Sequence, residues 1–242
     1  MKVTFIGIYG GYPKAGGANA SLLVEDKGVS IVIDMGSATV SHLESIKPID
    51  KIDSVIITHA HYDHYADAPI AVYGRLIAKQ LGRDLPPLDF YGPSDPSFER
   101  MLNMEGVSRF IPVDGSTRLS IGPFSISFHR TIHPVECYAV SVESCGRRLF
   151  YTSDGAFSDS IAAKAEGADL LVAECSFLSK HGSGSAMGHM NGKECALFAS
   201  KCNAALTRLI HIPYYSDTRD LEAEACIIPG SAIAWELETL EL

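Results

Sequence analysis

The segment at residues 58–64 reads Thr-His-Ala-His-Tyr-Asp-His and concentrates side chains that bind metal ions. Its three imidazoles and one carboxylate belong to His59, His61, Asp63 and His64. The apolar residues 55–57 predict a buried strand, so these side chains fall where that strand ends. Imidazole and carboxylate groups bind zinc or another first-row divalent ion. Four ligands exceed what one catalytic metal with an open position needs, so the segment predicts two metals rather than a His-rich surface turn.

The pattern H-x-H-x-D-H after an apolar strand resembles the signature of the metallo-β-lactamase-fold hydrolases. Other segments extend the resemblance in the family's order. Residues 31–36 look like the strand and turn before the main motif, and His133 looks like the histidine of the third motif. Asp154 resembles the bridging aspartate, and His211 resembles the last ligand. The resemblance covers roughly residues 1–215.

The resemblance implies a ligand set for two divalent metal ions per chain, zinc first, with manganese or iron as alternatives. One ion would be held by His59, His61 and His133, and the other by Asp63, His64 and His211, with Asp154 bridging both. A hydroxide shared by the two metals would be the nucleophile. Asp63 is therefore expected to serve catalysis as well as metal binding.

A faint internal repeat predicts the fold class. Residues 22–33 match residues 139–151 as strand, glycine turn and strand, and each pair is followed by a small-residue loop with an aspartate, Asp34 or Asp154. Each half then continues through a helix-like stretch to a further strand that opens on an aspartate. Two such halves predict a single α/β domain over residues 1–242, in which two sheets pack face to face with helices outside. The resemblance implies the same four-layer α/β/β/α sandwich.

The remaining elements follow from hydrophobic periodicity. Residues 66–82 predict a helix with Ile70, Leu76, Ile77 and Leu81 roughly on one face. Alternation over residues 120–129 predicts one half-buried strand, and a last strand is expected near residues 233–237. We also expect a strand at residues 85–93 and helices at residues 94–106, 192–203 and 221–225.

Composition bears on the size of the domain, the cellular compartment and the class of partner. With 242 residues and 46% hydrophobic content, the chain is long enough for one well-cored domain. No stretch resembles a transmembrane span, the start reads as a strand rather than a signal peptide, and the six cysteines lack C-x-x-C spacing. We therefore expect a cytoplasmic protein without a membrane partner. A formal charge of −9 argues against a general nucleic-acid binder, and the basic pair Arg147 and Arg148 is expected in a hairpin.

Four local features favour one branch of the family. His61 stands where flavodiiron proteins have a carboxylate, and Asp154 stands where common zinc β-lactamases have a cysteine. Residues 187–191 (Met-Gly-His-Met-Asn) and 173–177 (Ala-Glu-Cys-Ser-Phe) resemble segments of ribonuclease Z and related phosphodiesterases. The resemblance implies that His189 lies beside the scissile phosphate and that Glu174 orients it. The alternative for His189 is a cap on the helix near Gly192.

One departure from ribonuclease Z bears on the substrate. The long arm that grips tRNA lies between the third and fourth motifs of those enzymes, yet His133 and Asp154 are only 21 positions apart here. A small or short phosphodiester is therefore expected, and tRNA is not. Hydrolysis of an ester, thioester or lactone, and a binding protein without turnover, remain alternatives, and a homodimer is left open. His181, in a Gly/Ser-rich loop, is a further candidate for substrate contact, whereas His42 and His129 are expected to be structural.

Overall fold

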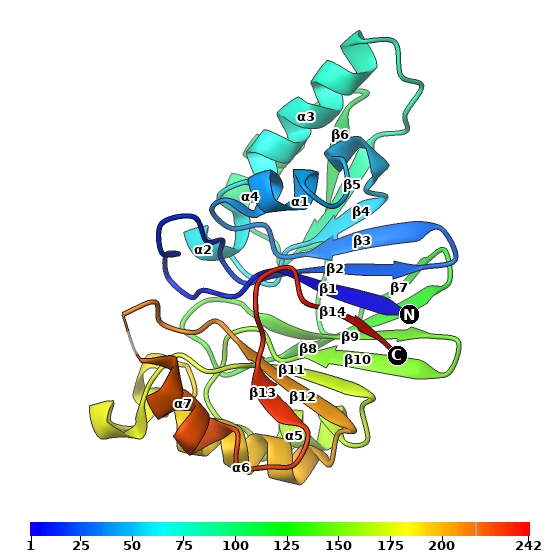
Figure 1. Cartoon of the computed structure of the whole chain (residues 1–242). Coiled ribbons are helices and arrows are strands. Elements are labelled where there is room, and N and C mark those ends of the chain that lie inside the picture. Colours follow the sequence, from blue (N-terminus) through cyan, green and yellow to red (C-terminus); the bar gives the residue numbers. More distant parts are fainter. Residues whose placement is uncertain (216) are drawn as a thin grey trace.

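The computed structural model describes residues 1–215 and 217–242, and within them two seven-stranded mixed sheets pack face to face (Figure 1). The first sheet has the order β14 (Thr239–Glu241), β1 (Lys2–Gly7), β2 (Ser21–Asp26), β3 (Val29–Ile33), β4 (Ser54–Ile56), β5 (Leu88–Gly92) and β6 (Ser108–Pro112). The second sheet has the order β7 (Arg118–Ile121), β8 (Phe124–Arg130), β9 (Tyr138–Ser144), β10 (Arg147–Tyr151), β11 (Leu170–Glu174), β12 (Leu206–Ile210) and β13 (Ser231–Ile233).

Helices cover both outer faces, which confirms the predicted α/β/β/α sandwich (Figure 1). The first half carries α1 (Thr39–Glu44), α2 (Tyr62–Tyr65), α3 (Ala68–Gln80), α4 (Pro96–Leu102) and the 3-10 turn η1 (Ile49–Lys51). The second half carries α5 (Asp159–Ala165), α6 (Gly192–Cys202), α7 (Thr218–Ala225) and the 3-10 turns η2 (Ser179–His181) and η3 (Gly184–Met187). Among the helices so described, none is long and apolar enough to cross a membrane.

The internal repeat is visible in the sheet topology. Hairpin β2–β3 pairs in parallel with β4, and hairpin β9–β10 pairs in parallel with β11. Both hairpin turns use two consecutive left-handed residues, Lys27–Gly28 and Cys145–Gly146. Glycine tolerates this conformation without the steric cost of a Cβ atom. The turns also touch, because the Ser144 hydroxyl donates a hydrogen bond of 2.6 Å to Asp26.

Two apolar cores hold the layers together. The larger core lies between the sheets, where Val24 and Ile31 of the first sheet meet Phe128 and Val140 of the second, and it continues under α5, α6 and α7. The smaller core packs the outer face of the first sheet against α1, α3 and α4. The strands between two covered faces are buried along most of their length, which explains their continuous apolar sequences.

The parallel strands determine where the polar loops gather. Strands β3, β4 and β5 run parallel in the first sheet, as do β10, β11 and β12 in the second. The carboxyl ends of parallel strands meet at one edge of a sheet, which is where open α/β folds bind ligands. The predicted site residues follow these ends: the 58–64 segment after β4, Asp154 after β10, Glu174 at the end of β11 and His211 after β12.

The helix predicted at residues 66–82 is confirmed as α3, but of the four apolar residues predicted on one face only Leu76 packs against the smaller core. Its apolar side chains Ile70 and Ile77 are exposed, and Leu81 beyond its end is exposed too. The face that packs inward instead carries small residues and Arg75, whose guanidinium donates hydrogen bonds to the carbonyl oxygens of Asp50 and Pro86. A buried cation satisfied by backbone carbonyls leaves no periodic apolar signal in the sequence.

Two strand predictions also need correction. The single strand expected over residues 120–129 is divided into β7 and β8 by a turn at Gly122, whose backbone is left-handed. The strand expected near residues 233–237 ends at Ile233, because a turn with left-handed Leu237 follows. The chain then crosses to the first sheet, where β14 pairs with β1.

Candidate metal centre

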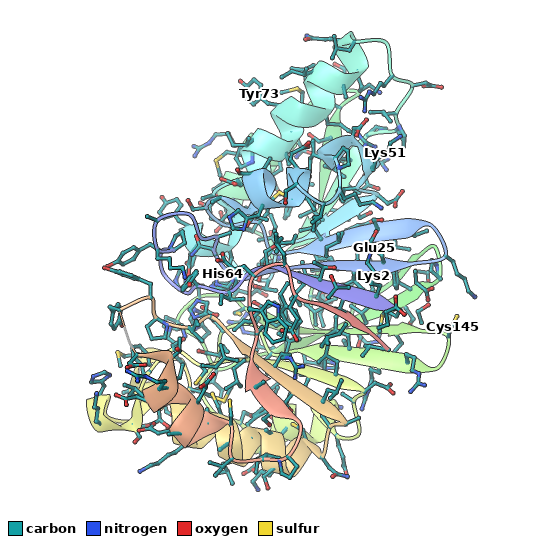
Figure 2. The ribbon with its side chains drawn as sticks, in the orientation of Figure 1. Lys2, Glu25, Lys51, His64, Tyr73 and Cys145 are labelled. Atoms are coloured by element: carbon teal, nitrogen blue, oxygen red, sulfur yellow. The ribbon has the colours of Figure 1, made fainter. Side chains whose placement is uncertain are left out.

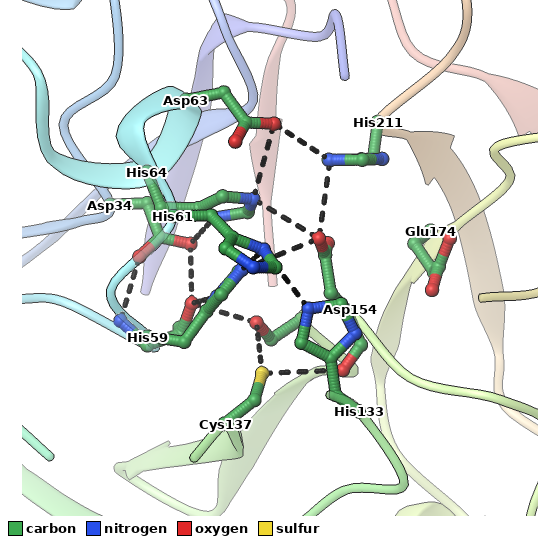
Figure 3. A network of polar contacts seen from close by, with 12 residues as sticks. Asp34, His59, His61, Asp63, His64, His133, Cys137, Asp154, Glu174 and His211 are labelled. Atoms are coloured by element: carbon green, nitrogen blue, oxygen red, sulfur yellow. Dashed lines mark hydrogen bonds and ion pairs between the residues drawn. The ribbon is translucent and has the colours of Figure 1, made fainter. Parts of the chain in front are cut away.

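The predicted ligands converge in two adjoining groups between the sheets (Figure 3). The first group contains His59, His61, His133 and Asp154, and the second contains Asp63, His64 and His211. In each group, one ligand atom from every residue lies within 4.8 Å of the others. The seven side chains come from both halves of the chain, so the centre exists only when the two sheets are packed.

The nitrogens of the first group are close enough to share one ion. Nδ1 of His61 lies 3.0 Å from Nε2 of His59 and 3.1 Å from Nε2 of His133. Four-coordinate zinc, with Zn–N distances of about 2.0–2.1 Å, separates its ligand atoms by about 3.3 Å. The spacing of these imidazoles therefore fits a small divalent cation.

Asp154 lies between the two groups. Its Oδ2 atom is 3.5 Å from Nε2 of His59, 3.4 Å from Nε2 of His64 and 3.4 Å from Nε2 of His211. The carboxylate thus faces nitrogens of both groups at once, which is the placement expected of a bridging ligand. Asp63 completes the second group, with its Oδ2 atom 3.1 Å from Nε2 of His211.

Fixed acceptors determine the tautomers of two of these histidines. Nδ1 of His133 donates to the carbonyl oxygen of Gly188 at 2.9 Å, and Nδ1 of His64 donates to the carboxylate of Asp34 at 2.8 Å. A carbonyl or carboxylate oxygen can only accept, so Nδ1 of each ring carries a proton. Nε2 is therefore the nitrogen of each ring that faces the centre.

Hydroxyl groups hold two further histidines in the same way. Ser176 donates to Glu174 at 2.5 Å, which leaves its oxygen to accept from Nδ1 of His211 at 2.8 Å. Thr58 donates to Asp34 at 3.0 Å and accepts from Nδ1 of His59 at 3.1 Å. Partners of this kind orient metal-binding histidines and raise their basicity.

Two buried polar atoms show that the donor set fits a metal. Nε2 of His64 and Oδ1 of Asp154 are buried and lack a hydrogen-bond partner among the described residues. Buried polar atoms in folded proteins are nearly always satisfied, and an unsatisfied one costs about 1–3 kcal/mol. Both orphaned atoms belong to the two groups, so coordination is the interaction that would satisfy them.

Charge divides the two groups. Burial lowers the pKa of His61 and of His133, and it holds the pKa of His59 well below its ordinary value, so these rings are neutral. Burial also opposes the charged form of His211, but Asp154 and Asp63 outweigh it and raise its pKa to about 9. For His64, Asp154 and Asp34 outweigh burial and hold the pKa well above its ordinary value. A metal entering the second group must therefore displace protons.

The Gly-rich loop near the N-terminus supports the second group. The backbone N–H of Gly11 donates to Oδ2 of Asp63 at 2.7 Å. Gly10 lies against the ring of His211, and a Cβ atom at that position would come within 2.3 Å of Nδ1. A residue without a side chain is therefore needed at position 10, because only then can the loop approach His211 this closely.

His189 and Glu174 also lie together, as predicted. Nδ1 of His189 is 3.1 and 3.2 Å from the two carboxylate oxygens of Glu174, and His189 further forms a possible ligand group with Asp154 and His211. Helix α6 is capped by Asn191, whose side chain accepts from the N–H of Glu194, while the Glu194 carboxylate accepts from the N–H of Asn191. The alternative of His189 as the helix cap is therefore wrong.

The sequence did not identify several supporting residues. Asp34 and Thr58 hold His64 and His59, Ser176 holds His211, and Thr131 with Cys137 fixes the carbonyl oxygen of Asp154. Thr58 and Asp34 stand beside recognisable motifs, which offered a signal. Thr131 and Cys137 carry none, because they reach Asp154 only through the fold.

Other candidate residues lie apart from the centre. His181 is exposed in η2, and His129 stacks on Phe150 at the surface of the second sheet. His42 lies near the carbonyl oxygen of Ile6. Arg147 and Arg148 belong to β10, where Arg147 pairs with Asp169 at 2.7 Å.

Comparison with known proteins places the chain in a family. A model described as "Beta-lactamase superfamily domain" matches residues 30–212. The chain is 35% identical over 227 residues to the Bacillus subtilis protein named "Probable metallo-hydrolase YhfI", covering 93% of this chain and 92% of that protein. The crystal structure of that protein, described as a metallo-β-lactamase fold protein, superposes with a TM-score of 0.94 at 34% identity, covering 99% of this chain and 98% of that chain.

Two further relatives are more distant. A ribonuclease Z from Bradyrhizobium diazoefficiens is 25% identical over 299 residues, with 98% of each chain covered. A diphosphatase from the PhnP family shares the fold, with a TM-score of 0.77 at 18% identity over 100% of this chain and 97% of that chain.

Removal of single ligands should separate the two groups. We expect close to two divalent ions per chain after reconstitution, mainly one in His211→Ala, and disturbance of both in Asp154→Ala, because only Asp154 faces both groups. Elemental analysis of the dialysed proteins measures this, with His129→Ala as a histidine control outside the centre. Binding of one ion or none by the unsubstituted protein would overturn the two-metal assignment.

Gly10→Ala should weaken metal binding without removing any ligand. The added methyl group meets the ring of His211, so the second group should lose most of its ion while the first keeps its own. Metal titration of the purified protein measures this. Gly115→Ala is the matched control, because its added methyl would meet nothing closer than Tyr138 at 3.9 Å. Equal metal affinity in both variants would show that the loop does not position His211.

Proposed function

The chain belongs to the β-lactamase superfamily, and we propose that it is a dinuclear metallo-hydrolase that cleaves a small or modest phosphodiester. The observation that carries the proposal is His189, held by Glu174 beside the two ligand groups. The names of its relatives also support a metal-dependent hydrolase of this kind, since they include a metallo-hydrolase, a ribonuclease Z and a diphosphatase.

The ligands proposed for the two ions, of which zinc fits the donor set best, are the residues of the two groups. His59, His61 and His133 would hold one ion, and Asp63, His64 and His211 the other, with Asp154 between them. When bound, the two metals would activate a water molecule for attack and offset negative charge on the phosphoryl oxygens.

His189 supplies the chain's own contribution to the chemistry. Its Nδ1 is occupied by Glu174, so Nε2 is the nitrogen left to meet a substrate. Burial alone would lower the pKa of His189, but the hydrogen bond and charge of Glu174 outweigh burial and raise it. The raised pKa favours the protonated ring, which is the form that can donate a proton. When the P–O bond breaks, the leaving oxygen can take this proton.

The shape of the second half limits the size of the substrate. The segment between His133 and Asp154 forms the compact hairpin β9–β10, with a turn at Cys145–Gly146. The structure describes every residue between His133 and Asp154, and none of them forms an inserted arm. The formal charge of −9 also disfavours a long polyanion.

Substitution of His189 tests the reaction. His189→Ala should keep its metals, and its kcat on bis(p-nitrophenyl) phosphate should fall about 10²–10⁴-fold, the usual range for a positioned acid or base. The fall in kcat should be larger for substrates with poor leaving groups than for those that release p-nitrophenolate, since a good leaving group needs no proton. Near wild-type turnover with both kinds of leaving group would contradict the role of His189 and favour ester, thioester or lactone hydrolysis instead.

The pH dependence of kcat should report on the same pair. Because protonated His189 is the active form and its pKa is raised, kcat should decline as the pH rises through that pKa. Glu174→Gln removes the negative charge that raises the pKa, so the decline should move to lower pH. In His189→Ala the decline should disappear. A decline that stays in place in both variants belongs to another group.

Precursor tRNA should be a poor substrate. Without an arm between His133 and Asp154, the protein should process precursor tRNA with a much lower kcat/KM than it shows for a small phosphodiester. Parallel kinetic assays on the two substrates with one metal-loaded preparation measure this. Comparable values would mean that another surface grips the tRNA.

A further inference from the structure

A cavity of about 230 Å³ opens directly beside the metal centre. It is lined by His189 and His211 of the site, and by Gly10, Gly11, Tyr12, Ser176, Phe177, Pro213 and Tyr215. We refer to it as the tyrosine cavity. Its walls come from three distant parts of the chain: the Gly-rich loop, the segment after β11 and the segment after His211.

Five of the side chains that line the cavity carry flat rings: Tyr12, Phe177, His189, His211 and Tyr215. The ring of Phe177 lies edge-on to His189 with centroids 5.8 Å apart, and His189 stacks on His211 at 5.5 Å. Tyr12 contacts Tyr214 at 4.7 Å. Several flat rings around one cavity favour a flat ligand, because stacked and edge-on contacts are the arrangements that aromatic groups prefer.

The Gly-rich loop and the segment after His211 are joined beside the cavity. The hydroxyl of Tyr12 donates to the hydroxyl of Tyr214 at 2.9 Å, which links residues 202 positions apart in the sequence. Tyr12, Tyr214 and Tyr215 nevertheless leave 57%, 41% and 62% of their surface exposed. Exposed aromatic side chains gathered around a catalytic pocket mark a binding surface more often than scattered apolar residues do.

Charge also restricts the occupant. The described residues that line the cavity include no Lys, Arg, Asp or Glu, and the histidines among them are His189 and His211 of the site. A second phosphate or a carboxylate would find no cation there. An uncharged group would lose little on leaving water.

We propose that the tyrosine cavity binds an uncharged planar aromatic ring attached to the leaving oxygen of the phosphodiester. The inference rests on the proposed function, because it takes His189 as the donor to that oxygen. His189 lines the same cavity as Phe177 and Tyr12, so a group on an oxygen that takes the His189 proton can extend into that cavity. The substrate class is then an aryl or nucleobase-bearing phosphodiester rather than a purely aliphatic one.

Binding of two small probes tests the cavity without requiring turnover. Calorimetry on the metal-loaded protein would compare phenylphosphonate with methylphosphonate, which share the metal-binding anion and differ in the ring. Stacking on aromatic side chains contributes about 1–3 kcal/mol per base, so we expect the phenyl compound to bind about tenfold more tightly. Equal affinities would overturn the proposal.

Variants of Tyr12 locate the effect. Tyr12→Ala should abolish most of the phenyl preference, and Tyr12→Phe, which keeps the ring but loses the bond to Tyr214, should retain most of it. Tyr12 is exposed, so neither change should unfold the protein, and unaltered metal content would verify this. Tyr73→Ala is the matched control: Tyr73 is similarly exposed but lies on α3, far from His64 (Figure 2). An unchanged preference in Tyr12→Ala would overturn the proposal.

The same proteins separate this inference from the proposed function. If bis(p-nitrophenyl) phosphate is not hydrolysed while the Tyr12-dependent phenyl preference holds, the phosphodiesterase assignment fails and the aromatic cavity stands. If it is hydrolysed while the two phosphonates bind equally, the assignment stands and the aromatic cavity fails.

Discussion

The carboxylate of Asp34 is the interaction on which the rest of the centre depends. It is fully buried, and a buried charge is tolerated only when hydrogen bonds replace its hydration. Its oxygens accept from the N–H and the hydroxyl of Thr58, from Nδ1 of His64 and from the hydroxyl of Tyr151. Three of these donors lie in the first half and Tyr151 lies in the second. One buried group therefore fixes the main ligand segment and ties it to the opposite sheet.

The internal repeat reappears at this level with different chemistry in each half. Asp34 follows β3 and accepts from the N–H of Thr58 at 2.8 Å, while Thr152 follows β10 and accepts from the N–H of Glu174 at 3.0 Å. The strand pairing thus makes Thr152, rather than Asp154, the counterpart of Asp34. Thr58 then supports His59, and Glu174 supports His189. Residues at equivalent positions, Thr58 and Glu174, thus support a candidate ligand in one half and the candidate proton donor in the other.

Much of this arrangement could be predicted from the sequence. The segment 58–64 places four candidate ligands after one strand, so local spacing was sufficient to propose them, and the repeat was sufficient for the layered fold. The supporting contacts were not predictable in this way. Gly10 meets His211 and Tyr12 meets Tyr214 across about two hundred residues, and only the packed sheets bring them together. Helix α3 was misjudged because a cation, Arg75, occupies its buried face.

Charge balance explains why the centre is built for cations. Asp34, Asp63 and Asp154 place three carboxylates around His64 and His211, and in their field both rings hold protons more tightly than free histidine does. The imidazoles thus supply the positive charge that these carboxylates require. A divalent ion can replace the protons, and it would also satisfy Nε2 of His64 and Oδ1 of Asp154, which have no hydrogen-bond partner among the described residues. The tyrosine cavity, which has no Lys, Arg, Asp or Glu among its described lining residues, adjoins this charged region. That arrangement fits the proposed substrate, an anionic phosphoryl group with a neutral substituent.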